Sequence, residues 1–339
     1  MAVKITDIAK KLNVSTATVS LALNGSELVN EKTKQKVLQT AKNMGYVPNA
    51  VARMLVKKQS NLIGLIVPDI QNPYFSTIVK HINDAVREKG YKLTIILSNN
   101  DAKEEENAID EMIQSRVDGL IVISIAIPNQ DVSYFEKLKT HSVPYIFCSD
   151  KYHESNAPIV ATDLRQGMLD LTSWVLQNNY QDIIYLTSQA GVYTFELREQ
   201  GFRQAVGPLE DRVKYSIVHM PYCDYQTACA TVQDLIEQGE LSDILPSNKS
   251  KMLMCPNDVC ALGALNTLIK NDIKVPDQVA VTGFDGVMFS EIASVPLTTM
   301  SIDIKAIAKT TVDNLIQLIN GEDISSVYIP TTLSVRQST

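Results

Sequence analysis

The sequence predicts an α/β fold class: a small all-α helix-turn-helix domain followed by two doubly wound parallel-sheet lobes. Two observations predict it. Residues 1–60 combine helical apolar periodicity with most of the excess positive charge, whereas residues 61–339 show short apolar runs separated by amphipathic stretches. The change of pattern near residue 61 marks the boundary between the two parts.

Composition restricts the class of protein. The chain has 339 residues of which 45% are hydrophobic, a globular composition. The N-terminus lacks an apolar segment behind a basic start, and no apolar stretch is long enough for a membrane span, so a cytoplasmic protein is expected. The five Cys form no CxxC pair and the four His lack ligand spacing. Reduced thiols, no metal site and no cofactor are therefore expected.

The net charge of −7 conceals an uneven distribution along the chain. Residues 1–60 contain ten Lys and Arg against three acidic residues, a net charge of +7, whereas residues 61–339 carry −14. Because phosphate neutralisation dominates affinity for nucleic acid, the basic segment is the part suited to meet DNA. The alternative is a solvated lysine-rich face, and the sequence motifs have to decide between these two interpretations.

Residues 5–26 (ITDIAKKLNVSTATVSLALNGS) read as two short helices joined by a tight turn. We expect Thr6 to cap the first helix, Asn13 to adopt the left-handed turn conformation and Ser15 to cap the second helix. On the second helix the inward face comprises Val19, Ala22 and Leu23. The outward face comprises Ala17, Ser20, Leu21 and Asn24. This arrangement is typical of a helix-turn-helix, and a generic helical hairpin is the alternative.

A third helix is predicted to begin after the cap Asn30 and to end at Gly45. Three helices of this length can enclose a small core. Pro48 stops any continuation, and Asn49 can cap a fourth helix that is too short to be stable alone. We therefore expect residues 48–60 to form a hinge helix and linker that orders only against a partner.

The patterns IxDIAxxxxVSxxTVSxxLNG and GYxPNAVARxL make a resemblance specific. With the downstream segments, the chain resembles the LacI/GalR family of transcription regulators over essentially its whole length. The resemblance implies that the second helix lies in the major groove and that the hinge helix pairs with its dimer mate on operator DNA. A leucine would wedge into the central base step through the minor groove. That leucine is Leu55, and ordinary hinge-helix core is its alternative role.

The resemblance also assigns DNA contacts residue by residue. Base-edge readers would be Thr16, Ala17 and Leu21. Residues nearer phosphate would be Ser15, Thr18 and Asn24. The DNA-binding set is completed by Thr6, Asn49, Arg53 and Leu55.

Leu21 departs from the family pattern. Most members carry an arginine there, which forks onto guanine O6 and N7, whereas leucine offers only apolar contact, for instance to a thymine methyl group. We therefore predict an operator half-site without a required G·C pair at that position. A drifted contact in a weak binder is the alternative.

The larger part contains apolar runs predicted to be strands, at 62–67, 92–97, 118–124, 143–148, 182–187, 251–255 and 278–284. Strands that alternate with amphipathic helices indicate parallel α/β units wound on both faces of a sheet. The run appears twice, which predicts two lobes resembling type I periplasmic sugar-binding proteins. No GxGxxG, GxxxxGK[ST] or GxSxG motif occurs, so nucleotide-binding and hydrolase functions lose their main support.

These patterns divide the chain into a helix-turn-helix headpiece (1–47), a hinge helix with linker (48–60) and an effector-binding core (61–339). Within the core, the first lobe is expected to comprise about 61–160 plus 292–321. The second lobe is expected to comprise about 161–291 plus 322–339. Because parallel sheets bind ligands at the carboxyl ends of their strands, a cleft is expected between the lobes.

Polar turns follow the predicted strands. The resemblance places the family's sugar contacts on Asn72, Phe75, Asp150, Arg198, Asn257 and Asp285. Carboxylates and an amide can fix hydroxyl groups, an arginine can hold a ring or anionic oxygen, and an aromatic ring can cover the apolar face of a sugar. Tyr225, which follows a strand at 213–219, is a candidate stacking residue. Each also has an ordinary role as core, loop cap or surface residue.

Ile302 is a second departure, since relatives commonly place a sugar-contacting glutamine there. An effector that is less hydroxylated than a simple hexose, differently oriented, or packed against an apolar patch would fit this loss. Three alternatives stay open: a corepressed regulator with a non-sugar or phosphorylated ligand, a sugar-processing enzyme with paired carboxylates, and a transport binding protein. Residues 1–60 would be superfluous to the last two.

The sequence thus predicts a non-enzymatic, homodimeric repressor of a carbohydrate-utilisation operon, with no catalytic residues. Its partners would be pseudo-palindromic operator DNA and a small sugar-like effector, with no membrane partner. The resemblance implies that effector binding closes the lobes and changes whether the hinge helices can pair. The chain shows no trailing heptads, so a coiled-coil tetramer is not expected.

Overall fold

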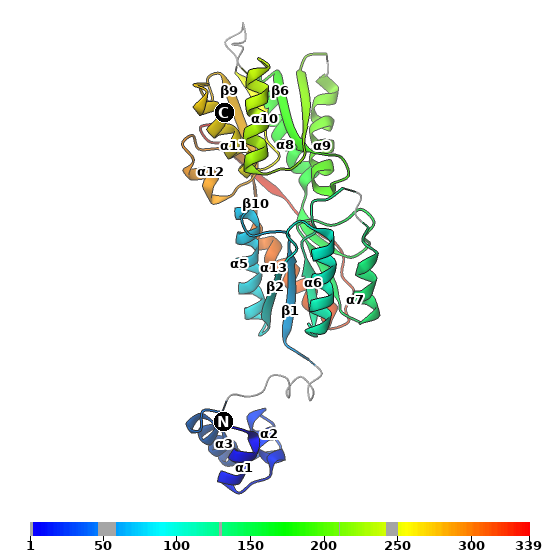
Figure 1. Cartoon of the computed structure of the whole chain (residues 1–339), viewed down its shortest axis with the longest axis vertical. Helices are drawn as coiled ribbons and strands as arrows, with labels where there is room; N and C mark the ends of the chain where they lie inside the picture. Colours follow the sequence, from blue (N-terminus) through cyan, green and yellow to red (C-terminus); the bar gives the residue numbers. More distant parts are fainter. Residues whose placement is uncertain (1–2, 47–58, 129–130, 210, 242–249) are drawn as a thin grey trace. The chain divides into compact units, whose positions relative to one another are not determined.

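The computed structural model describes residues 3–46, 59–128, 131–209, 211–241 and 250–339. It consists of two compact units, Met1–Ser60 and Asn61–Thr339 (Figure 1). Among the described residues, no helix has both the length and the apolar character needed to cross a membrane.

The first unit contains three helices, α1 (Ile5–Leu12), α2 (Thr16–Leu23) and α3 (Glu31–Asn43). Their buried apolar side chains form one small core, made of Ile8, Ala9, Val19, Ala22, Val29, Val37 and Ala41. On α2, Val19 and Ala22 are buried whereas Ala17, Leu21 and Asn24 are exposed. The predicted inward and outward faces of this helix are therefore confirmed.

Most of the predicted helix ends are confirmed. Ser15 caps α2 by accepting a hydrogen bond from the Thr18 amide, and Asn13 has a φ of 50° in the turn before it. The Thr6 cap is wrong, because α1 begins two residues earlier than predicted and Lys4 occupies the cap position. The Asp7 carboxylate accepts a hydrogen bond of 2.9 Å from the Lys4 amide, so an acidic side chain inside the helix satisfies its first turn.

The second unit contains two six-stranded sheets, one in each lobe. The first sheet has the order β11-β5-β4-β3-β1-β2. Its strands, in that order, are Val327–Ile329, Ile159–Thr162, Tyr145–Cys148, Gly119–Val122, Leu62–Val67 and Lys92–Leu97. Helices α5 (Pro73–Glu88) and α13 (Ile304–Ile319) cover one face, and α6 (Ala102–Gln114), η1 (Ser133–Phe135) and α7 (Glu136–Thr140) cover the other (Figure 1).

The second sheet has the order β12-β10-β9-β8-β6-β7. Its strands, in that order, are Thr331–Ser334, Thr298–Ile302, Val279–Asp285, Lys251–Met254, Asp182–Ser188 and Lys214–Met220. Helices α8 (Leu164–Gln177) and α9 (Tyr193–Val206) pack on one face, and α10 (Tyr225–Glu237) and α11 (Asp258–Lys270) on the other. The turn η2 (Gly207–Leu209) follows α9, and the short α12 (Met288–Ile292) follows β9. Within the two sheets, β12 pairs antiparallel with β10 and the other pairs are parallel.

Near the C-terminus, the chain passes between the two lobes at positions that differ from the predicted lobe boundaries. Strand β10 pairs with β9 in the second sheet, although the sequence assigns 292–321 to the first lobe. Strand β11 pairs with β5 in the first sheet, although 322–339 is assigned to the second lobe. The chain crosses between β5 and α8, between β10 and α13, and between β11 and β12. These boundaries are wrong because β10, β11 and β12 are short and partly polar and carry little apolar pattern.

Helices α8 and α9 approach each other closely at Gly201. A Cβ atom there would lie 2.2 Å from the Arg165 carbonyl oxygen, so Gly201→Ala is expected to lower the free energy of unfolding by about 1–3 kcal/mol. Urea-induced unfolding followed by circular dichroism measures the change. Gly207→Ala, at the end of α9, is the matched control, because its Cβ would meet no atom within 4 Å. Equal stability of the two variants would contradict the close crossing.

Candidate functional sites

The outward face of α2 presents small and apolar side chains rather than charged ones. Thr16, Ala17, Leu21 and Asn24 are exposed, and the Leu21 side chain is 37% exposed although it is apolar. A helix with an exposed face of this kind can enter the major groove, where apolar groups meet thymine methyl groups. The cations lie elsewhere on the unit: α1 carries Lys10 and Lys11 in its last turn.

Ser15 and Thr18 are hydrogen-bonded to each other at the start of α2. Their hydroxyl oxygens are 2.8 Å apart, and the Ser15 oxygen also accepts the Thr18 amide hydrogen. The free amides of a helix N-terminus favour an anion, so a phosphate contact at this end agrees with the prediction for these two residues. Thr6 is exposed on α1. The predicted DNA contacts Asn49, Arg53 and Leu55 lie outside the described residues.

In the second unit, each sheet has a switch point where the strand order reverses, between β1 and β3 and between β6 and β8. Ligands of open α/β sheets bind outside the carboxyl ends of strands at such points. The predicted polar turns after β1, β4 and β8 and the end of β9 lie at these carboxyl ends. The cleft expected from the sequence is therefore at the edge where the two lobes meet.

Arg198 and Asp285 form a buried ion pair in the second lobe. Arg198 projects from α9 and Asp285 ends β9, and the guanidinium donates to the carboxylate over 3.1 Å. The side chains are 8% and 7% exposed. The guanidinium also lies 4.5 Å from the centroid of the Phe284 ring, within cation–π range.

This ion pair is incompletely satisfied. Among the described residues, the buried Arg198 Nε has no hydrogen-bond partner. Burial raises the pKa of Asp285 to about 6, although the Arg198 charge and hydrogen bond lower it. Asp285 also has a φ of 109°, an unusual conformation for a residue other than glycine. A strained, underpaired charge pair is the kind of group that a polar ligand completes.

Asp150 joins the two lobes. It follows β4 of the first sheet, and the Thr194 hydroxyl of α9 donates to its Oδ2 over 3.2 Å while the Lys151 amide donates to its Oδ1. Burial raises the pKa of Asp150 to about 7, whereas these hydrogen bonds and the Arg198 charge lower it. Asp150, Arg198 and Asp285 therefore belong to one cluster of charges at the meeting edge.

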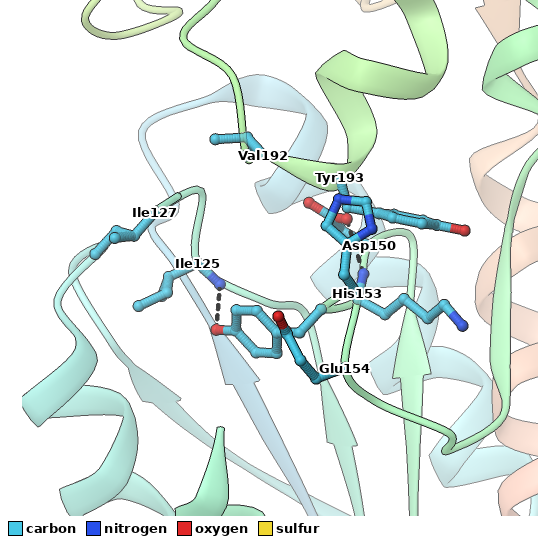
Figure 2. A pocket seen from close by; sticks show the side chains of 10 residues that line it. Ile125, Ile127, Asp150, His153, Glu154, Val192 and Tyr193 are labelled. Atoms are coloured by element: carbon cyan, nitrogen blue, oxygen red, sulfur yellow. Dashed lines mark hydrogen bonds between the residues drawn. The ribbon is translucent and has the colours of Figure 1, made fainter. Parts of the chain in front are cut away.

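Two further contacts cross between the lobes beside Asp150. His153 Nε2 lies 2.9 Å from the Glu196 carboxylate on α9, and Lys151 Nζ lies 5.7 Å from the centroid of the Tyr193 ring. Figure 2 shows Asp150 and His153 facing the start of α9. Asp150, His153 and Tyr193 line a cavity together with Ile125 and Ile127 of the first lobe (Figure 2).

The cavity has a volume of only about 20 Å³. One water molecule needs roughly 10–15 Å³ on this measure, so the cavity has room for water and not for a sugar ring. A sugar-sized ligand can enter only if the loop after β4 separates from the first turn of α9. A ligand of that size would therefore require these contacts between the lobes to break.

The predicted residues after β1 lie on the first lobe. Asn72 caps α5, its side-chain oxygen accepting from the Tyr74 amide over 3.0 Å. Phe75 is half-buried against the first-lobe core, with its ring 5.6 Å from that of Tyr74. Tyr74 donates to or accepts from Ser149 next to Asp150. The pKa of its hydroxyl is raised mainly by burial, with smaller effects of Asp285 and Arg198, which places it near the charge cluster.

Asn257 and Tyr225 have other partners. The Asn257 side chain caps α11, accepting from the Cys260 amide over 2.8 Å and donating to the Cys223 carbonyl over 3.0 Å. The Tyr225 hydroxyl accepts a hydrogen bond from Asn266 Nδ2 over 2.7 Å, so this side chain links α10 to α11. Neither contacts the Arg198–Asp285 pair among the described residues, so the structure brings together only part of the predicted set.

Ile302 packs against the hydrophobic cores of both lobes. It ends β10, one residue before the chain crosses to α13. A glutamine at position 302 would place a polar amide among the apolar side chains at the point where the chain passes between the lobes. The departure noted in the sequence therefore has a packing role.

The sequence interpretation missed a buried carboxylate, Asp258. It accepts from the Thr299 hydroxyl over 2.5 Å and from the Val287 amide over 2.8 Å, which ties α11 to β10 and to the turn after β9. Burial raises its pKa to about 8, and the nearby Asp285 adds to the effect. Tyr74 and Thr194 were also missed. The only signal was their position in the first turn of a helix that follows a strand, near the predicted Phe75 and Arg198.

Two family models match the chain. The model of periplasmic binding proteins and the sugar-binding domain of the LacI family covers residues 60–337. The model of bacterial regulatory proteins of the lacI family covers residues 4–49. Together they span both compact units.

Individual proteins are similar over nearly the full length. The chain is 27% identical over 336 residues to the HTH-type transcriptional repressor PurR of Histophilus somni, covering 98% of both chains. It is 29% identical over 337 residues to the ribose operon repressor of Halalkalibacterium halodurans, covering 99% of this chain and 96% of the relative. A solved structure of the Lac repressor dimer bound to operator and the anti-inducer ONPF superposes with a TM-score of 0.86 at 23% identity, covering 100% of this chain and 99% of that one.

Proposed function

Because the chain belongs to the LacI family of bacterial regulatory proteins, we propose that it represses transcription by binding a pseudo-palindromic operator as a homodimer. The chain is a transcriptional regulator by family. We further propose that a small sugar-like effector binds between the two lobes and controls operator affinity. Carbohydrate utilisation is the process that we expect its target operon to serve.

One observation supports the effector site above the others. The buried Arg198–Asp285 pair lies at the carboxyl edge of the second sheet and leaves Arg198 Nε without a partner among the described residues. A hydroxyl or ring oxygen of a sugar would satisfy that donor, and Asp285 and Asp150 would accept from neighbouring hydroxyls. Phe75 would cover the apolar face of the ring, and Asn72 lies in the same turn.

The proposed mechanism couples this site to DNA through the angle between the lobes. An effector held between Asp150 and the Arg198–Asp285 pair replaces the direct contact of Asp150 with Thr194 by contacts through the ligand. The change of angle shifts the first lobes against each other across the dimer and alters the pairing of residues 48–60. We propose that the effector releases the operator, so that the regulated genes are induced.

We propose a cytoplasmic, non-enzymatic role. The two relatives described above are repressors, and a headpiece that reads DNA has no use in a glycosidase or a transport protein. The remaining alternative is a corepressed regulator with a phosphorylated or non-sugar ligand. It differs from the first proposal in the sign of the effect on operator binding.

A thermal-shift screen of sugars and sugar phosphates on the full chain tests the proposal. D-ribose and other pentoses, hexoses and disaccharides form the first panel, and their phosphates form the second. We expect one neutral sugar to raise the melting temperature and to weaken operator binding in a gel-shift assay. Tightened binding by a phosphorylated compound would favour the corepressed alternative, and turnover of a glycoside would contradict the non-enzymatic role.

The raised pKa of Asp150 predicts that effector binding depends on pH. When ionised, its two oxygens accept strong hydrogen bonds from hydroxyl groups, whereas protonation turns one oxygen into a donor and removes the charge, and burial raises its pKa to about 7. We expect the affinity for the sugar found in the screen to fall about tenfold between pH 8 and pH 6, as measured by isothermal titration calorimetry. Asp150→Asn should remove this dependence, and Asp234→Asn on the exposed side of α10 should keep it.

Asp150→Asn is also expected to change the stability of the free protein. A carboxyl group whose pKa is raised by folding binds more protons in the folded state, so it makes the protein less stable as pH rises from about 4 to about 7. Asp150→Asn is therefore expected to raise the melting temperature of the free protein at pH 8 and to change it little at pH 4. A lower melting temperature at pH 8 would contradict the assigned burial.

A further inference from the structure

A carboxyl group in the core of the first lobe, Glu105, has no part in the sites described above. It lies on α6 and is 0% exposed. Its Oε2 accepts hydrogen bonds from the hydroxyls of Tyr134 over 2.5 Å and Tyr152 over 2.7 Å. Among the described residues, its Oε1 is buried without a hydrogen-bond partner. The charge is therefore buried at the cost of one unsatisfied oxygen.

An apolar side chain at position 105 would be buried at a lower cost in free energy. The same face of α6 contributes Ala108, Ile109 and Met112 to a hydrophobic core that also contains Tyr152. Burial raises the pKa of Glu105, and the hydrogen bonds from Tyr134 and Tyr152 lower it. What a carboxylate offers here, and leucine or methionine does not, is an acceptor for two hydroxyl groups.

The hydrogen bonds of Tyr152 have a fixed direction. The backbone N–H of Ile125 donates to the Tyr152 hydroxyl over 3.0 Å, so the hydroxyl oxygen is the acceptor in that bond. Its only proton then points to Glu105. Tyr152 itself is 6% exposed, and its ring packs edge-on against Phe147 of β4. Glu105 thus completes a chain of two hydrogen bonds that starts at the Ile125 backbone.

Two of the three linked residues, Ile125 and Tyr152, reach the cavity between the lobes. Ile125 follows β3, and Tyr152 is two residues after Asp150 in the loop that follows β4. Ile125, Asp150 and Tyr152 all line the cavity, and Figure 2 shows the hydrogen bond that leaves the Ile125 amide. The Tyr152 hydroxyl therefore ties together the two first-lobe segments that face α9.

We infer that Glu105 is a positioning residue for the effector site: through the Tyr152 hydroxyl, its carboxylate holds the end of β3 and the Asp150 loop at a fixed spacing. The inference rests on the proposed function, because it takes this cavity to be the effector site. Glu105 does not line the cavity, and we infer that it acts on the cavity through the Tyr152 hydroxyl. Tyr134, which bonds to the same oxygen, lies outside the cavity lining.

Four single substitutions in the full-length protein separate this role from simple packing. Tyr152→Phe and Glu105→Leu break the chain of hydrogen bonds. Glu105→Gln keeps a side-chain oxygen for the hydroxyls. Tyr134→Phe is the matched control, since it removes one hydroxyl from the same carboxylate and leaves the hydrogen bonds from Ile125 to Tyr152 and from Tyr152 to Glu105 in place.

Two readouts report on the cavity without any added sugar. Hydrogen–deuterium exchange followed by mass spectrometry measures the protection of the Ile125 amide, and carbon-13 NMR of labelled aspartate follows the titration of Asp150. We expect Tyr152→Phe and Glu105→Leu to speed exchange of that amide about tenfold. They should also move the Asp150 titration from about 7 toward the ordinary range of aspartate. Glu105→Gln and Tyr134→Phe should leave both readouts close to wild type.

Equal effects of Tyr134→Phe and Tyr152→Phe would overturn the inference, because they would show a general loss of packing in the lobe. An unchanged Asp150 titration in Glu105→Leu would overturn it as well. Failure of the proposed function has a different signature. A sugar screen without a hit would contradict the effector proposal while both readouts still follow the Glu105 variants.

Discussion

Arg198→Met is expected to abolish effector binding and to lower the free energy of unfolding by about 3–5 kcal/mol. The substitution leaves the buried Asp285 carboxylate without its ion-pair partner. It also removes the guanidinium that lies over the Phe284 ring. Urea-induced unfolding and effector titration measure the two losses. Arg203→Met is the matched control, since Arg203 lies on the same helix with a half-exposed side chain.

The loss of stability in Arg198→Met should depend on pH. Without the cation, the pKa of Asp285 rises above its value of about 6, so the folded protein holds the proton to higher pH. A raised carboxyl pKa reduces stability as pH rises. The defect is therefore expected to be larger at pH 8 than at pH 5. A second substitution, Asp285→Leu, should restore part of the stability but not the binding, which separates the two roles of the pair.

Leu21→Arg is expected to change the operator sequence that the protein selects. The Leu21 side chain is exposed on the outward face of α2, and an arginine there can reach the O6 and N7 atoms of a guanine. The gain should be about 1–3 kcal/mol of discrimination for each half-site. Selection of binding sites from random DNA should return an obligatory G·C pair for the variant and none at that position for the wild type.

Leu28→Arg is the matched control for this experiment. It adds the same charge to the same unit, but Leu28 lies in the turn after α2 and is 85% exposed. Its extra charge should raise the affinity for all DNA sequences and should not change the selected bases. An obligatory guanine at the same position for the wild-type protein would contradict the assignment of Leu21 as a base reader.

The sequence was informative where burial is strong. Runs such as LIGLIV and GLIV are apolar without interruption because their strands are buried on both faces by helices, and this pattern predicts central parallel strands. Strands β10 and β12 contain Thr and Ser, and β11 has only three residues. Their pairing follows from where the chain crosses between the lobes, which no local pattern encodes. The lobe boundaries were wrong for that reason.

The candidate effector site was predictable in its location and only partly in its contacts. Asp150, Arg198 and Asp285 follow or face the carboxyl ends of strands, and parallel topology brings such positions together. The partners of Asn257 and Tyr225 were not predictable, because they depend on how α10 packs against α11. The link from Glu105 to Tyr152 spans 47 residues and leaves no periodic signal.

The central claim is that operator DNA and the effector act on one coupled equilibrium. Isothermal titration calorimetry of the effector found in the screen, with and without saturating operator DNA, tests it most directly. We expect two affinities that differ by the same factor by which the effector changes operator affinity, on the order of 5–150-fold. Equal effector affinities in the presence and absence of operator would contradict it.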